Sequence, residues 1–211
     1  MELDEALSQI SQIRQHMANA SVFRGYRSAT AAFSGLVAIA ASCAQALWVE
    51  YPYWNTRGYL TVWLAAALIS VGAAAAEMIS RCIRSQSALQ KEMALAAAEQ
   101  FIPSLVSGAL LTFVMVKYAY PQIWLLPGLW AILFALGVFA SRRVLPKLVA
   151  IVGGYYLLAG LVCIAVTDER SAFSPWTMGV IFAPGQFLAA GVLWWTLERN
   201  TTKTHDQDPM N

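Results

Sequence analysis

LVAIVGGYYLLAGLVCIAVT, residues 148–167, is the stretch that decides the fold. Its 20 residues include no charged side chain, while Lys147 precedes it and Asp168, Glu169 and Arg170 follow it. An α-helix of roughly 20 apolar residues crosses about 30 Å of hydrocarbon and satisfies its backbone hydrogen bonds internally. The stretch therefore predicts a membrane-spanning helix.

Five further uncharged windows accompany it, at residues 28–49, 58–76, 100–116, 118–141 and 171–197. Only 12% of the residues are charged and 58% are hydrophobic, whereas soluble domains carry about 25% charged residues. We predict an all-α, polytopic six-helix transmembrane bundle, built as three helical hairpins. Its domain covers residues 28–199, with spans at about 28–49, 58–80, 102–120, 122–141, 147–167 and 173–197.

Basic residues predict the orientation, because Lys and Arg stay on the cytoplasmic side during insertion. With the N-terminus in the cytoplasm, cytoplasmic segments hold Arg14, Arg24, Arg27, Arg81, Arg84, Lys91, Arg142, Arg143, Lys147, Arg199 and Lys203. Only Arg57 and Arg170 fall in outer loops, and Lys117 lies near the outer end of the third span. We expect a multi-pass protein of the plasma (inner) membrane with both termini in the cytoplasm.

Aromatic residues gather toward the predicted outer side, where amphipathic rings settle at the headgroups. They are Trp48, Tyr51, Tyr53, Trp54, Tyr59, Trp63, Tyr118, Tyr120, Trp124 and Trp176. An interfacial belt is the simpler interpretation. A ligand vestibule built from the group between Tyr51 and Tyr59 is the alternative.

Residues 1–27 carry a heptad pattern of apolar side chains, which predicts an amphipathic cytoplasmic helix. The seam consists of Leu3, Ala6, Ile10, Ile13, Met17 and Ala20. A helix this short needs a surface, so it lies on the membrane, packs under the bundle or docks on a partner through Leu3, Ile10, Ile13 and Met17. Residues 81–100 predict a second cytoplasmic helix, whereas residues 200–211 are polar and predict a disordered cytoplasmic tail.

Two Pro-Gly pairs suggest an internal repeat, as in many membrane proteins that move solutes. Pro127 lies 15 residues before Arg142, and Pro184 lies 15 before Arg199. Related hairpins would explain the spacing. So would the ordinary frequency of Pro and Gly in spans.

No motif for catalysis, metal binding, haem binding or nucleotide binding occurs in the sequence. The two histidines, His16 and His205, lie outside the spans, so axial ligands for a transmembrane haem are missing. We predict no cofactor, no metal site, no catalytic residue and, with a net charge of +2, no nucleic-acid partner. The three cysteines imply no disulfide framework.

Two ionisable residues lie within spans, and such residues are functional candidates by default. Glu77 stands one helical turn before Arg81, so an ion pair at the interface explains it equally well. Lys117 can extend its ammonium group to the headgroups. Because the two lie in opposite leaflets, they do not form a relay.

The sixth span contains the strongest candidate for an intramembrane polar site, at Pro184, Gly185 and Gln186. Proline there frees the carbonyl of Val180, and such breaks coordinate ions or line cavities in transporters. Tyr155 and Tyr156 of the fifth span, and the second Pro-Gly pair at Pro127 and Gly128, complete the predicted set. The alternative is ordinary helix packing with hydrogen bonds between helices.

The first span carries a small residue at every fourth position: Ser34, Ala38, Ser42 and Ala46. Such a stripe permits close helix contact, either within the chain or in a homo-oligomer.

These features favour a non-catalytic regulatory, sensory or accessory role, exerted through the cytoplasmic helices and a protein partner at that face. A small-solute transporter or channel with a site near Gln186 is the second hypothesis. A lipid-directed membrane enzyme is the third. Membrane lipids are partners under all three.

Overall fold

The computed structural model describes residues 28–49, 55–84, 88–143 and 145–198. The predicted N-terminal helix, with Leu3, Ile10, Ile13 and Met17, lies outside the described residues. So do the predicted tail at 200–211 and the aromatic residues Tyr51, Tyr53 and Trp54.

Every regular element in the described part of the chain is helical. The elements are α2 (Ser28–Trp48), α3 (Thr56–Arg84), α4 (Ala88–Tyr118), η1 (Tyr120–Leu125), α5 (Leu126–Ala140), η2 (Ser141–Arg143), α6 (Val149–Val166), α7 (Pro175–Leu193) and η3 (Trp194–Glu198). Six helical segments are long and apolar enough to cross a membrane. The all-helical prediction is therefore confirmed, and the six segments suggest a multi-pass membrane protein.

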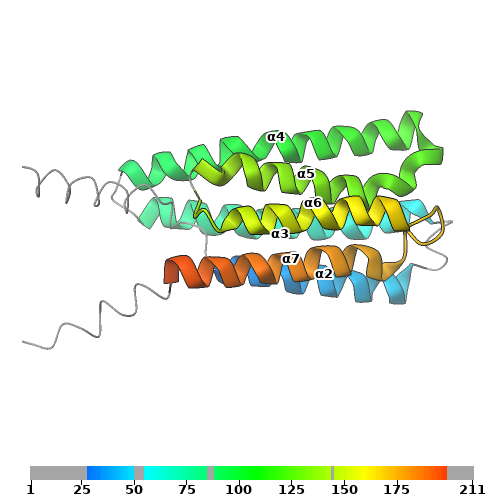
Figure 1. Ribbon diagram of the computed structural model, residues 1–211, viewed down its shortest axis with the longest axis horizontal. Helices are drawn as coiled ribbons and strands as arrows, with labels where there is room; N and C mark the ends of the chain where they lie inside the picture. Colours follow the sequence, from blue (N-terminus) through cyan, green and yellow to red (C-terminus); the bar gives the residue numbers. More distant parts are fainter. Residues whose placement is uncertain (1–27, 50–54, 85–87, 144, 199–211) are drawn as a thin grey trace, which may run out of the picture.

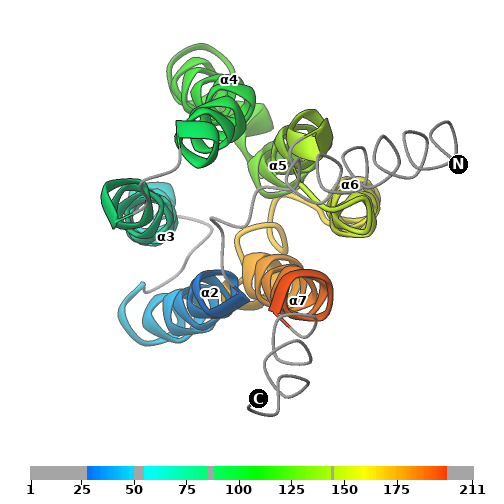
Figure 2. The ribbon, with the colours of Figure 1, turned by 90° about the vertical axis from the view of Figure 1, so that its left-hand side faces the viewer.

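The six long helices lie roughly along one common axis (Figure 1), and the end-on view shows them arranged in a ring (Figure 2). They follow one another around the ring in chain order, and α7 closes it by packing on α2. The most extensive contacts are those of α2 with α7 and of α5 with α6. Among ring neighbours, α3 and α4 touch least, so the ring is weakest along that side.

Small residues bring α2 and α7 together. The Ser42 side chain contacts Gly179, and the Phe187 ring lies 3.1–3.3 Å from where a Cβ of Gly35 would stand. Ser34 and Ser42 are buried, and their hydroxyls donate to the carbonyls of Thr30 and Ala38 in their own helix. The small stripe of α2 therefore packs within the chain at Ser34, Ala38 and Ser42, whereas Ala46 is exposed.

Glycines also set the distance between α5 and α6. A Cβ at Gly160 would stand 2.7 Å from the Gly128 carbonyl oxygen and 2.8 Å from Ile132 Cγ1. Contact this close, with backbone against backbone, excludes any side chain at Gly160. Pro127 lies in the first turn of α5, just after η1, where a missing N–H costs no helical hydrogen bond. Pro184, in contrast, lies inside α7, and the repeat stays a prediction.

A buried polar network joins α2, α3 and the segment before α7 toward the end of the bundle where α2 stops and α3 starts, on the right in Figure 1. The Gln45 side chain is fully buried; its Oε1 accepts the Trp63 indole N–H at 2.6 Å and its Nε2 donates to the Phe173 carbonyl at 2.8 Å. Tyr59 lies beside it, stacked on Trp130 at 6.5 Å and tilted against Phe173 at 4.7 Å. Three segments distant in sequence are thus joined at one buried amide.

The same network corrects the prediction of an aromatic belt at two positions. Tyr59 and Trp63 are buried, because the indole N–H finds its partner in Gln45 rather than at the headgroups. Trp48, Tyr118, Tyr120 and Trp176 remain exposed on the outside of the ring.

A compact turn between α6 and α7 positions Phe173 for this network. Asp168 Oδ1 accepts hydrogen bonds from the Ser171 hydroxyl at 2.6 Å, the Ser171 N–H at 2.8 Å and the Arg170 N–H at 3.1 Å. The hydrogen bond from the Ser171 hydroxyl is the main reason that the pKa of the Asp168 carboxyl is lowered. The ionised carboxylate therefore favours the turn.

Replacing Gln45 with leucine is expected to destabilise the bundle by about 2–5 kcal/mol. The change leaves the Trp63 indole N–H and the Phe173 carbonyl buried without partners, at roughly 1–3 kcal/mol each. Thermal unfolding of the purified protein in detergent measures the effect. Gln122→Leu is the matched control, since Gln122 is exposed; equal stability of the two variants would contradict the role of this network.

Candidate ligand-binding cavity

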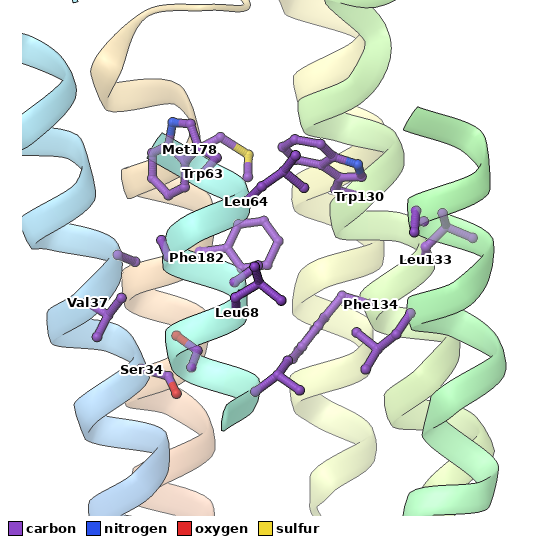
Figure 3. Close-up of a pocket in the computed structure, with 18 of the residues that line it drawn as sticks. Ser34, Val37, Trp63, Leu64, Leu68, Trp130, Leu133, Phe134, Met178 and Phe182 are labelled. Atoms are coloured by element: carbon purple, nitrogen blue, oxygen red, sulfur yellow. The ribbon is translucent and has the colours of Figure 1, made fainter. Parts of the chain in front are cut away.

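A cavity of about 430 Å³ lies inside the ring, between α2, α3, α4, α5 and α7 (Figure 3). Its walls consist mostly of aliphatic and aromatic side chains, among them Val37, Leu64, Leu68, Leu133 and Met178. None of the described residues that line it is charged. The volume is within the range of about 300–1,000 Å³ that small-molecule pockets occupy.

Two tryptophans, Trp63 and Trp130, lie with Met178 at one end of the cavity (Figure 3). The Trp63 indole N–H is bonded to Gln45, and the Trp130 indole N–H donates to Thr112 Oγ1 at 2.9 Å. The Thr112 hydroxyl in turn donates to the Gly108 carbonyl at 2.7 Å. Both indoles therefore offer a ligand only apolar ring surface.

An aromatic cluster forms another part of the wall. The Phe134 ring lies 5.3 Å from Phe101, 5.8 Å from Phe182 and 4.7 Å from Tyr156, measured between centroids. Edge-on and tilted pairs of this kind are favourable contacts that hold rings in place. The cluster joins α4, α5, α6 and α7 at a preformed apolar surface.

Gln186 is the exception in this apolar lining. Its side chain lines the cavity and is only 8% exposed. Within the described part of the chain, its amide makes no hydrogen bond, whereas the equally buried hydroxyls of Ser34 and Thr112 donate to backbone carbonyls. A buried amide without a partner costs free energy, so it is available to a ligand.

The structure brings together part of the polar set predicted from the sequence. The Tyr155 hydroxyl shares its hydrogen between the carbonyls of Val180 and Ile181, at 3.1 Å each, and the Tyr156 hydroxyl donates to Phe182 at 3.2 Å. Val180 has the carbonyl that loses its helical partner at Pro184. Tyr155 of α6 therefore provides a hydrogen-bond donor for the Val180 carbonyl of α7.

Gly185 and Gln186 face different neighbours, because successive residues of a helix are turned by about 100°. A Cβ at Gly185 would stand 2.6 Å from the Tyr156 hydroxyl, so this glycine lies against α6. Gln186 points to the cavity instead. The predicted set thus divides between a helix contact and a ligand cavity.

Pro127 and Gly128 do not join this group. Gly128 packs on Gly160 and Ile164, one to two turns further along α6 from Tyr156.

The two ionisable candidates lie away from the cavity. Lys117 is exposed at the end of α4, with its Nζ 5.5 Å from the Phe113 ring centroid and 5.2 Å from that of Tyr118. Glu77 is half-buried near the other end of the ring, on α3. The predicted pair of Glu77 with Arg81 depends on a side chain outside the described part.

Sequence reasoning missed most of the cavity, including Gly108, Trp130, Phe134 and Phe182. A single apolar sequence carries no signal for which of its aromatic residues face inward. Gln186 alone was identifiable, because an amide in the middle of a span is conspicuous.

Comparisons with protein-family models, with curated protein sequences and with solved structures give no match. Within the described residues, no cluster of three or more His, Cys, Asp or Glu side chains could hold a metal ion.

Proposed function

We propose that this chain is a non-catalytic protein of the inner membrane with a sensory, regulatory or accessory role. The role begins with the binding of an apolar molecule in the cavity of the ring. The observation that carries this proposal is the uncharged cavity of about 430 Å³ with the unpartnered amide of Gln186 in its wall.

The orientation of the chain in the membrane is inferred from the distribution of Lys and Arg. In the orientation predicted from the sequence, eleven of the 14 basic residues fall in cytoplasmic segments and three do not. Among the described residues, Arg84, Arg142 and Lys147 lie at the end of the bundle where α3 stops and α6 starts. Basic residues remain on the cytoplasmic side, so both termini face the cytoplasm. All six long helices then cross the membrane, and the network at Gln45 lies on the outer side.

A cavity of this size and polarity needs an occupant. An apolar space of this size left empty loses the dispersion contacts of its lining side chains. Water does not fill the space well, because apolar cavities stay dry. An apolar molecule is therefore the favoured occupant.

The contacts favour binding over the two other hypotheses. An ion pathway would use the free carbonyl of Val180, but Tyr155 already donates to it. Chemistry on a lipid would need an acid or base, or a nucleophile activated by one, beside the ligand. None of the described residues that line the cavity is an acid or a base; its polar side chains are Ser, Thr and Gln together with the two Trp indoles. Transport of an uncharged solute past Gln186 stays the second candidate, since Pro184 removes one helical hydrogen bond of α7 beside it, although the helix continues through the proline.

Purification of the full chain in mild detergent tests the proposal. We expect mass spectrometry of the extracted small molecules to identify one class of apolar molecule, retained in stoichiometric amounts after detergent exchange. Recovery of only the bulk membrane lipids, washed out by the exchange, would contradict ligand binding.

The proposed protein partner is tested separately, by deleting residues 1–20. The deletion removes the seam at Leu3, Ile10, Ile13 and Met17. We expect membrane insertion to persist and the co-purifying partner to be lost. An unchanged set of partners would rule out docking through this segment.

A further inference from the structure

The side of the ring between α3 and α4 adds a route and a ligand class to the proposed function, on which this inference rests. We infer that the ligand is an uncharged amphiphile with a single hydrocarbon chain and a small hydroxyl or carbonyl head. It enters sideways from the bilayer, between α3 and α4, and its head bonds to the amide of Gln186.

The route is inferred from exposed cavity residues on the side of the ring between α3 and α4. Leu64, Leu68 and Val71 of α3 line the cavity and are 41%, 73% and 41% exposed. Leu105 of α4 lines it too and is 37% exposed. Because α3 and α4 make the least contact of any ring neighbours, the cavity opens between them. In a bilayer this opening faces hydrocarbon.

The cavity is elongated along the bundle axis. The lining residues of α4 run from Phe101 to Thr112 and those of α7 from Met178 to Gln186, which correspond to about 12–16 Å along the axis. An apolar space of this length suits a single hydrocarbon chain that lies along the axis.

The uncharged lining of the cavity favours a ligand with an uncharged head. A charged head would lose its hydration with no opposite charge among the described lining residues, at a cost of several kcal/mol or more. A hydroxyl or carbonyl loses far less, and the Gln186 amide can both donate to it and accept from it. Gln186 also lies 12 residues before Glu198, the end of η3, which is roughly 18 Å along the helix and too deep for a phospholipid headgroup at the interface.

Photolabelling of the reconstituted full chain tests this inference. Vesicles contain either a long-chain alcohol with a diazirine in mid-chain or a phospholipid with the same diazirine in one acyl chain. We expect the alcohol to label the interior positions Leu133, Phe134 and Phe182. The phospholipid should label outward positions such as Leu158 and Val162, which are 65% and 56% exposed.

Gln186→Leu is expected to lower interior labelling by the alcohol by roughly two- to tenfold, the worth of one neutral hydrogen bond. Labelling of Leu158 and Val162 serves as the internal control and should not change. Equal interior labelling by both probes, or none by either, would overturn the inference, as would an unchanged yield in Gln186→Leu.

The two failures are distinguishable. If the purified protein retains an apolar molecule but the alcohol never labels the interior, the ligand class or the route is wrong and the proposed function stands. If the protein retains nothing, the proposed function fails as well.

Discussion

Replacing Gly108 with phenylalanine is expected to reduce the amount of retained apolar molecule more than tenfold. Gly108 lines the cavity, and a Cβ added there meets nothing closer than Leu133 Cδ1 at 3.9 Å. The new ring therefore extends into the cavity without displacing the backbone, and it occupies the space that the ligand needs. Extraction and mass spectrometry of the purified variant measure the loss.

Gly72→Phe is the matched control for this substitution. Gly72 lies on α3 with nothing within 4 Å of its added Cβ, is exposed, and does not line the cavity. We expect the Gly72 variant to retain the molecule as the natural protein does. The ligand-free Gly108 variant should unfold at the same or a higher temperature than the ligand-free natural protein, because filling an empty cavity stabilises. Full retention in Gly108→Phe would place the ligand elsewhere.

Replacing Gly160 with valine is expected to cost about 3 kcal/mol or more of stability. The added Cβ would stand 2.7 Å from the Gly128 carbonyl oxygen, and a backbone atom cannot rotate away as a side chain can. Helices α5 and α6 must separate, and the position of Phe134 in the cavity wall shifts with α5. Thermal unfolding and the yield of folded protein in detergent measure the loss.

Gly154→Val on the same helix is the control, because no atom lies within 4 Å of its added Cβ. Both substitutions place valine inside α6, so the change in helix propensity is the same in the two variants. The Gly154 variant should therefore keep nearly the natural stability. Equal losses in the two variants would mean that α5 and α6 are not held at this distance.

The helices could be predicted from the sequence because each apolar run is long enough for a helix that could cross a bilayer. The boundaries were less predictable. The sequence predicts that residues 81–100 form a cytoplasmic helix that continues the second span or leads into the third. In the structure α3 continues to Arg84, and α4 runs from Ala88 through Pro103 to Tyr118. Pro103 lies in the middle of α4, and a proline inside a long helix can be accommodated without ending the helix, so Pro103 marks no boundary.

The cavity could not be predicted, because it depends on which helices become neighbours. Pro184, Tyr155 and Gln186 are unusual for a span and stand out in the sequence. Which tyrosine bonds to a carbonyl of α7, and which side chain faces the cavity, depends on how α6 and α7 pack and cannot be worked out from a single sequence. Tyr59 and Trp63 show the same limit. Tyr and Trp are residue types that are common at the headgroups. Only the position of Gln45 beside them explains why Tyr59 and Trp63 are buried.

The most direct test of the account is a high-resolution structure of the full chain in a lipid nanodisc, obtained with a bound antibody fragment to aid image alignment. The account predicts elongated density inside the ring, between Trp63 and Trp130 at one end and Gln186 at the other, continuous with the gap between α3 and α4. A ring in which α3 packs tightly on α4, with no space beside Gln186, would contradict it.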